Sequence, residues 1–115
     1  MISRYAIVET DSIGANVSVA EFSIVRAGVK IGNQVTIHPH VVINPGVTIG
    51  DGVEIFPGST IGKEPKGAGA TSRPLTFKAH LEISQNCLIG PNAVLYYDVI
   101  LGENTLVGDG ASIRE

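Results

Sequence analysis

The segment IGNQVTIHPHVVINPGVTIGDGVEIFPGSTI, residues 31–61, divides into groups of six that each begin with isoleucine. Counting back in sixes continues the series through Val25, Val19, Ile13 and Ile7. An amphipathic helix would need apolar residues three and four apart, and an ordinary half-buried strand would alternate without interruption. The sixfold period therefore predicts short strands joined by tight corners, which is the hexapeptide form of the parallel β-helix.

Glycines show how many sixes make one turn. Gly14, Gly32 and Gly50 each follow an opening residue and lie 18 residues apart. Eighteen residues predict three strands per turn and a triangular prism, in which the first and fifth residues of each six point inward and the sixth points outward. The fourth position is rich in Gly and Asn, as expected of a corner with positive φ; examples are Asn16, Gly28, Gly46, Gly52 and Gly58. About fifteen sixes make about five turns.

One insertion interrupts the period. The pattern stops after Gly62 and resumes with ISQNCL at Ile83, so 16 extra residues enter there, and Leu81 and Glu82 are expected to complete the broken six. We assign residues 63–80 to an extruded loop on a single β-helix domain, residues 1–115. This loop carries a net charge of +3, although the chain as a whole carries −3.

Composition excludes several classes of function. The net charge and the sequence pI near 5.5 argue against general nucleic-acid binding, which needs a basic face. The sequence has no signal-like start and no apolar run near the ~18 residues of a membrane span, so we expect a cytoplasmic protein without a membrane span. One cysteine excludes an internal disulfide, and Cys87 is expected inside the prism as a small hydrophobe.

The sixes around the insertion resemble the hexapeptide-repeat transferases, whose fold is a left-handed β-helix. HVVINPGVTIGDGVEIFPGSTIG, then the loop, then LEISQNCLIG, is similar in layout to the UDP-N-acetylglucosamine O-acyltransferases and to acetyltransferases of nucleotide sugars. The resemblance implies a homotrimer with active sites between subunits and a histidine base. It also implies transfer of an acyl or acetyl group from acyl-CoA or acyl carrier protein, without a bound cofactor, to a sugar or nucleotide-sugar hydroxyl or amine.

Three histidines are candidates for the base that such a transfer needs near neutral pH. His38 and His40 occupy corner positions, and their neighbours one turn away lie 18 residues before and after: Ala20 and Phe56 for His38, Phe22 and Gly58 for His40. Gly58 leaves space beside His40, so His40 is the first candidate, with packing on Phe22 as the structural alternative. His80, at the end of the loop, is the third.

The basic loop is the candidate phosphate site. Lys63, Lys66, Arg73 and Lys78 could hold the phosphates of CoA or of a nucleotide sugar, or an acidic carrier protein. The alternative is a solvated excursion without a ligand. The loop lacks the GxxxxGK[ST] spacing, which excludes a P-loop.

Two other functions remain open. One is a γ-class carbonic anhydrase, which holds a metal with three histidines on the same prism; the spacing of IHPH does not match that family, and we assign no metal ligands. The other is a non-enzymatic β-helical scaffold.

The resemblance also implies that the catalytic histidine of the lipid A acyltransferases falls beyond Glu115. We therefore expect this chain to be the amino-terminal part of a longer enzyme, with little activity by itself. Outward Ile24, Val42 and Ile100, all at sixth positions, predict the trimer interface.

Overall fold

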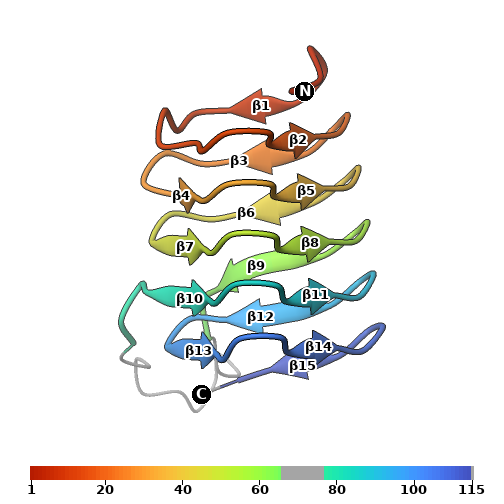
Figure 1. Cartoon of the computed structure of the whole chain (residues 1–115). Coiled ribbons are helices and arrows are strands. Elements are labelled where there is room, and N and C mark those ends of the chain that lie inside the picture. Colours follow the sequence, from red (N-terminus) through yellow and green to blue (C-terminus); the bar gives the residue numbers. More distant parts are fainter. Residues whose placement is uncertain (66–76, 115) are drawn as a thin grey trace.

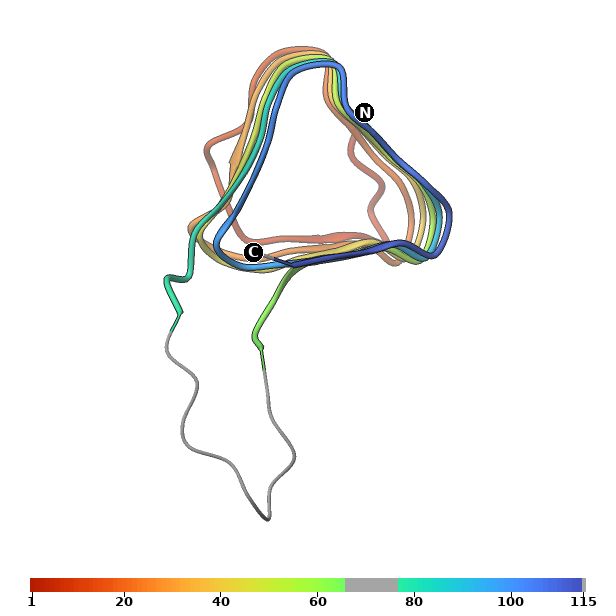
Figure 2. The ribbon, with the colours of Figure 1, turned by 90° about the horizontal axis from the view of Figure 1, so that it is seen from below.

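Strands one turn apart pair in parallel and build the three sides of a prism (Figure 1). The computed structural model describes residues 1–65 and 77–114. Viewed along its axis, the chain traces a triangle and winds as a left-handed, single-stranded β-helix of about five turns (Figure 2). The predicted fold class is confirmed.

Each side of the prism is one sheet. The six-stranded sheet contains, in spatial order, β1 (Ile7–Val8), β3 (Ile24–Val25), β6 (Val42–Ile43), β9 (Thr60–Lys63), β12 (Val94–Tyr96) and β15 (Ser112–Ile113). The five-stranded sheet contains β2 (Ser18–Val19), β5 (Thr36–Ile37), β8 (Glu54–Ile55), β11 (Leu88–Ile89) and β14 (Leu106–Val107). The four-stranded sheet contains β4 (Lys30–Ile31), β7 (Val47–Ile49), β10 (Leu81–Ile83) and β13 (Val99–Leu101).

Branched side chains fill the prism as the period predicts. The openers Val25, Ile43 and Ile61 and the fifth residues Val29 and Val41 are fully buried. Burial of one such side chain stabilises the fold by roughly 1.5–3 kcal/mol. Cys87 is also buried at its fifth position, and its Sγ lies 3.1 Å from the carbonyl oxygen of Gly102.

In the described sixes after the first turn, the fourth position adopts the left-handed conformation. Asn16 and the four glycines expected at corners all have positive φ. The same conformation recurs at Phe22 (φ 64°) and His40 (φ 62°), where a bulky side chain makes it costly. The corner geometry therefore comes from the winding of the chain and holds even where the residue type opposes it.

The first turn differs from the prediction. Val8 pairs with Val25 and Ile7 with Ile24, so this turn is one residue shorter than the others. Ile7 faces outward, 53% exposed, and Val8 takes the inward place. The assignment of Ile7 as an inward opener was wrong, because a slip of one residue moves a strand residue to the opposite face.

The regular pairing of the prism is interrupted between β9 and β10. Leu81 lies in register with Val47 and Val99, which confirms that the returning chain completes the broken six. On the outgoing side β9 extends to Lys63, so the loop starts one residue later than expected. Within the described ranges 1–65 and 77–114, no helix is long and apolar enough to span a membrane.

Candidate functional site

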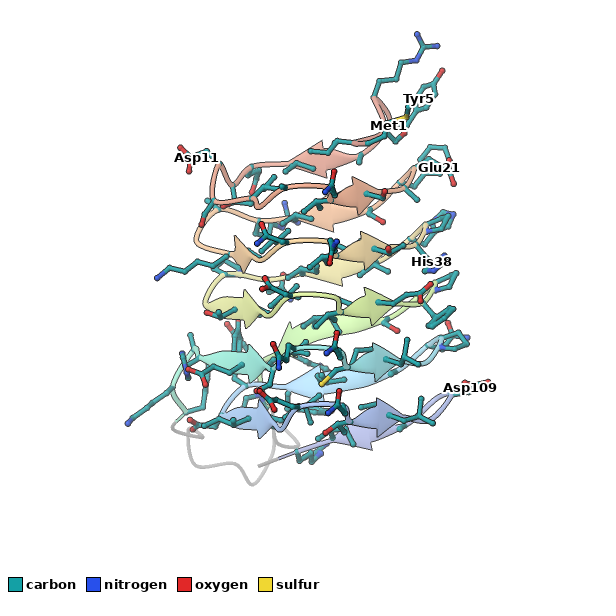
Figure 3. All side chains as sticks on the ribbon, viewed as in Figure 1. Met1, Tyr5, Asp11, Glu21, His38 and Asp109 are labelled. Carbon is teal, nitrogen blue, oxygen red and sulfur yellow. The ribbon has the colours of Figure 1, made fainter. Side chains whose placement is uncertain are left out.

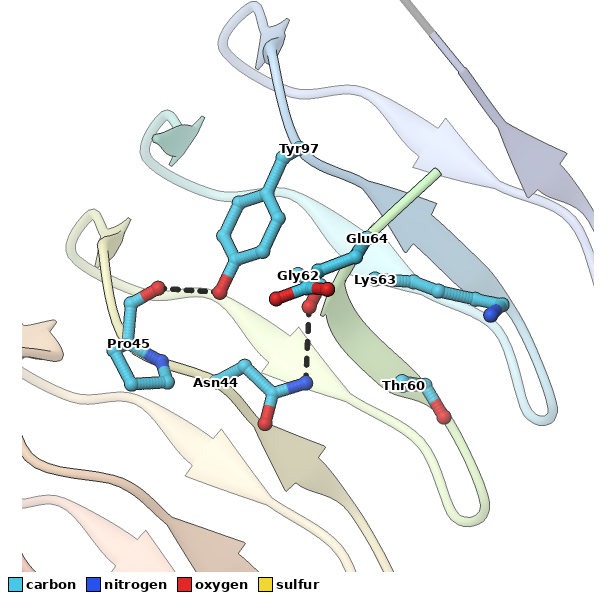
Figure 4. A pocket seen from close by; sticks show the side chains of 7 residues that line it. All are labelled: Asn44, Pro45, Thr60, Gly62, Lys63, Glu64 and Tyr97. Carbon is cyan, nitrogen blue, oxygen red and sulfur yellow. Dashed lines mark hydrogen bonds between the residues drawn. The ribbon is translucent and has the colours of Figure 1, made fainter. Parts of the chain in front are cut away.

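A cavity of about 510 Å³ opens at the loop corner (Figure 4). The loop corner is the edge where the six-stranded sheet meets the four-stranded sheet and the loop leaves the prism (Figure 2). The cavity is lined by Asn44, Pro45, Thr60, Gly62, Lys63, Glu64 and Tyr97. Amide, hydroxyl, carboxylate and ammonium groups thus surround one space. Such a combination suits a polar ligand that carries both hydroxyl groups and negative charge.

Tyr97 forms the inner wall of this cavity and is only 5% exposed. Its hydroxyl donates a 2.6 Å hydrogen bond to the carbonyl oxygen of Pro45, and its ring stacks on Phe77 at a centroid distance of 5.6 Å. Burial, aided by the carboxylate of Glu64, raises the pKa of the Tyr97 hydroxyl. The hydroxyl is therefore neutral and remains a donor at physiological pH.

A β-bulge at Gly62 leaves space for the ring of Tyr97. Leu95 pairs with Ile61 and Tyr96 with Lys63, which leaves Gly62 as an extra residue at φ 91°. A Cβ at Gly62 would lie 3.1 Å from Val47 and 3.2 Å from the Tyr97 ring. The carbonyl oxygen of Gly62 accepts a 2.9 Å hydrogen bond from the Asn44 side chain.

Cations stand on both limbs of the loop. The Lys63 ammonium lies 5.7 Å from the centroid of the Tyr96 ring, and Arg114 covers that ring at 4.2 Å. On the returning limb, the amide of Lys78 donates to a carboxylate oxygen of Asp98 at 3.2 Å. Two other predicted phosphate ligands, Lys66 and Arg73, lie outside the described residues.

His80 also belongs to the loop corner, on its four-stranded side. Its Nε2 lies 3.1 Å from a carboxylate oxygen of Glu82, and its carbonyl oxygen accepts a hydrogen bond from the amide of Asp98 at 2.8 Å. A carboxylate on Nε2 favours the tautomer that carries its proton there, which leaves Nδ1 able to accept one. This pair can therefore act as an oriented general base.

His38 and His40 lie at a different edge, the histidine corner between the five-stranded and six-stranded sheets. Figure 3 labels His38 at this edge. The predicted neighbours are confirmed: His38 stacks on Phe56 at 4.7 Å and His40 on Phe22 at 5.4 Å. Ser23 braces this corner, because its hydroxyl donates to the His38 carbonyl oxygen at 2.7 Å. One prism does not bring these histidines to the loop corner.

Sequence reasoning missed the acidic partners of the histidines. Glu54 accepts from Nε2 of His38 at 2.7 Å, and Glu82 pairs with His80. Glu54 is the neighbour of Thr36, two residues before His38, so the turn of 18 places it next to the imidazole. The role of Tyr97 had no comparable indication, because its partner is 52 residues away.

Within residues 1–65 and 77–114, no group of three His, Cys, Asp or Glu side chains is placed to hold a metal ion. His38 and His80 each meet one glutamate instead.

The comparisons with known proteins agree with this architecture. The family model described as bacterial transferase hexapeptide (six repeats) matches residues 12–45, 28–63 and 80–115, more than half of the chain. The structure of LpxA, a UDP-N-acetylglucosamine acyltransferase from Bacteroides fragilis, is 32% identical with a TM-score of 0.86. That match covers 100% of this chain and 46% of LpxA, so the chain spans about half the length of that relative.

A second structure shows the fold alone. AntD, an N-acyltransferase from Bacillus cereus in complex with dTDP and 3-hydroxybutyryl-CoA, is 20% identical with a TM-score of 0.83. The match covers 99% of this chain and 69% of AntD. No curated protein matches the chain.

Proposed function

Because the chain belongs to the bacterial transferase hexapeptide family, we propose that it takes part in acyl transfer from CoA or acyl carrier protein to a hydroxyl or amine of a sugar or nucleotide sugar. The observation that carries this proposal is the cavity at the loop corner, where polar side chains lie next to the first residues of the basic loop. LpxA and AntD, both acyltransferases with this fold, support it.

The cavity would receive the acceptor. Asn44 and Thr60 offer hydrogen bonds to sugar hydroxyls, and Glu64 could accept from a hydroxyl or an amine. Lys63 stands at the same wall, where a phosphate group of the acceptor or the donor would meet it. Lys66, Arg73 and Lys78 of the loop would extend this positive charge.

The base would remove a proton from the acceptor's hydroxyl or amine. The lone pair of that oxygen or nitrogen would add to the thioester carbonyl carbon. The tetrahedral intermediate then expels the thiolate, which takes up a proton. Among the three histidines, His80 is the one that shares a corner with the cavity and also has an orienting carboxylate, Glu82. We therefore place His80 ahead of His40 and His38.

A trimer would complete the site. Ile24 and Val42 are successive outward residues on the six-stranded sheet, whereas Ile100 lies on the four-stranded sheet. We assign the interface to these two sides, on which each subunit would meet two neighbours; the five-stranded sheet also exposes apolar side chains, Leu88 and Leu106. In such an assembly the histidine corner of one subunit can approach the loop corner of the next.

A turnover assay tests the proposal. The protein is incubated with acetyl-CoA or longer acyl donors and a panel of amino- and hydroxy-sugars and their nucleotide derivatives, and release of free thiol is followed. Loss of a general base typically costs 10²–10⁴-fold in rate, so His80→Ala should lower turnover about 100-fold or more, and His40→Ala should leave it within a few-fold.

Three other results would redirect the assignment. Activity abolished by His40→Ala but kept by His80→Ala would move the base to His40. Activity found only in a longer chain, and indifferent to all three histidines, would place the base beyond Glu115. No thioester binding at all would favour the scaffold function.

A further inference from the structure

A second hollow, of about 310 Å³, lies at the N-terminal end of the histidine corner, far along the prism from the loop. It lies between the first residues of the chain, Met1 and Ser3, and the imidazole of His38, with Ala20 and Glu21 beside them. Figure 3 shows Met1, Glu21 and His38 along the same edge of the molecule. Its volume is at the lower end of the roughly 300–1,000 Å³ of small-ligand pockets.

One face of the His38 ring packs against an aromatic ring, and a carboxylate fixes the orientation of the imidazole. Phe56 stacks on it at 4.7 Å with an interplanar angle of 11°, and Glu54 fixes Nε2 at 2.7 Å. The opposite face points toward the previous turn, where the equivalent residue is Ala20. A methyl group there leaves the imidazole face without a stacking partner from its own column.

The turn spacing matches aromatic stacking. Neighbouring strands lie about 4.7–4.9 Å apart, and the His38 and Phe56 rings repeat that distance. A planar ring placed beside the Ala20 methyl group, in the same turn as Ala20, would therefore stack on His38 as Phe56 does from the other side. The adjacent column of the same corner shows such a ladder filled, with Tyr5 on Phe22 at 6.1 Å and Phe22 on His40 at 5.4 Å.

The polar groups at the rim of the hollow indicate which kind of planar ring would bind there. Met1 and the methyl group of Ala20 supply the apolar surface of the hollow, whereas the side chains of Val19 and Ile37 are buried in the prism. Polar groups stand around it: the Glu21 carboxylate and hydroxyls of Ser3, Ser18 and Thr36. A carboxylate accepts hydrogen bonds from an amino group, and hydroxyls donate to ring nitrogens. A heteroaromatic ring that bears an exocyclic amine matches this rim better than a purely apolar ring.

We propose that this hollow is an adenine-binding site, in which the base stacks on His38 beside the methyl group of Ala20. The adenine could come from CoA or from a free adenine nucleotide. The first source rests on the proposed acyl transfer, whereas adenine binding itself does not. Within one prism the site is separate from the loop corner, and it does not include His80, the base to which the reaction is assigned.

Filling the hollow tests the proposal. Ala20→Phe would supply the missing ring and exclude the base. Gly108→Phe is the matched control: Gly108 occupies the same position of its six at the same corner, and among the described residues no atom other than those of its chain neighbours lies within 4 Å of where its Cβ would be. Binding of AMP, UMP and CoA is measured by calorimetry on each protein.

The expected result is that wild type and Gly108→Phe bind AMP alike, at least tenfold tighter than UMP, and that Ala20→Phe weakens AMP binding at least tenfold. His38→Ala should weaken it several-fold and His38→Phe should restore it, because stacking and not charge is required. If circular dichroism shows that Ala20→Phe does not fold, the comparison of His38→Ala with His38→Phe tests the proposal instead.

Undetectable AMP binding at millimolar concentration, equal binding of UMP, or full AMP affinity in Ala20→Phe with full affinity in His38→Ala would each overturn the proposal. If Ala20→Phe also weakens CoA binding, the adenine of CoA uses the site; if only AMP is affected, a free nucleotide does. Acyl transfer is assayed separately with the loop-corner variants. A negative adenine result with intact turnover would therefore reject this site and leave the proposed function standing.

Discussion

The hydroxyl of Tyr97 donates a hydrogen bond of 2.6 Å to the carbonyl oxygen of Pro45, a residue 52 positions earlier in the chain. The two residues lie on either side of the turn from which the loop departs. Phe77, on the returning limb, stacks on the same tyrosine ring. Tyr97 therefore links both sides of the interruption and shapes the cavity.

Tyr97→Phe should lower the free energy of unfolding by about 1 kcal/mol, because it removes one hydrogen bond and leaves the Pro45 carbonyl without that donor. Urea unfolding followed by circular dichroism measures the change. Tyr5→Phe is the matched control, since Tyr5 is an exposed tyrosine at another edge. Equal stability of Tyr97→Phe and wild type would show that this bond does not hold the corner together.

The stability contributed by Tyr97 should also depend on pH. Its pKa in the folded protein is raised above the ordinary value of 10.0, so the folded state holds the phenolic proton more tightly than the unfolded state does. The contribution is then fully present below about pH 10 and is lost as the pH rises through the folded pKa. The stability difference between wild type and Tyr97→Phe should accordingly shrink above pH 10. A constant difference would contradict this.

Gly62→Ala should destabilise the protein by about 1–3 kcal/mol. The residue sits at φ 91°, where a side chain is strained, and the new methyl would press on Val47 and the Tyr97 ring. Gly108→Ala is the control, because no atom of the described residues, apart from those of its chain neighbours, lies within 4 Å of its Cβ position. Thermal unfolding of both variants decides the matter, and equal midpoints would argue against a strained bulge.

Val42→Lys should convert a trimer into monomers, since a charge would enter the outward apolar column shared with Ile24. Thr36→Lys, an outward exchange on the five-stranded sheet and so outside the two sides assigned to the interface, serves as the control. Light scattering at micromolar concentration reports the mass of each protein. A wild-type chain that is monomeric under these conditions would refute the trimer.

Replacing Lys63, Lys66 and Arg73 with serine should weaken binding of CoA or of a nucleotide sugar and reduce its dependence on salt, because fewer phosphate contacts would be screened. Arg4→Ser removes a positive charge at the N-terminal end of the prism and should change little. Calorimetry at two salt concentrations separates the variants. Unchanged affinity in the loop variant would mean that the loop is a spacer.

The sequence alone determined everything that repeats. A period of six and a turn of 18 specify which residues point inward and which corners need positive φ. They also specify which side chains meet across turns, so the contacts Phe22–His40 and His38–Phe56 could be predicted. The reason is that each rung lies directly on the previous one, so a fixed offset in sequence becomes a fixed neighbour in space.

Only the tertiary structure decided what departs from the repeat. The shorter first turn put Val8 inward in place of Ile7, and the bulge at Gly62 opened the loop corner. Side-chain direction decided that the Glu54 carboxylate reaches Nε2 of His38. The packing of turns on both sides of the loop decided that the Tyr97 hydroxyl reaches the carbonyl oxygen of Pro45. A local change in corner length costs little and leaves no periodic trace, so its consequence appears only when neighbouring turns are packed together.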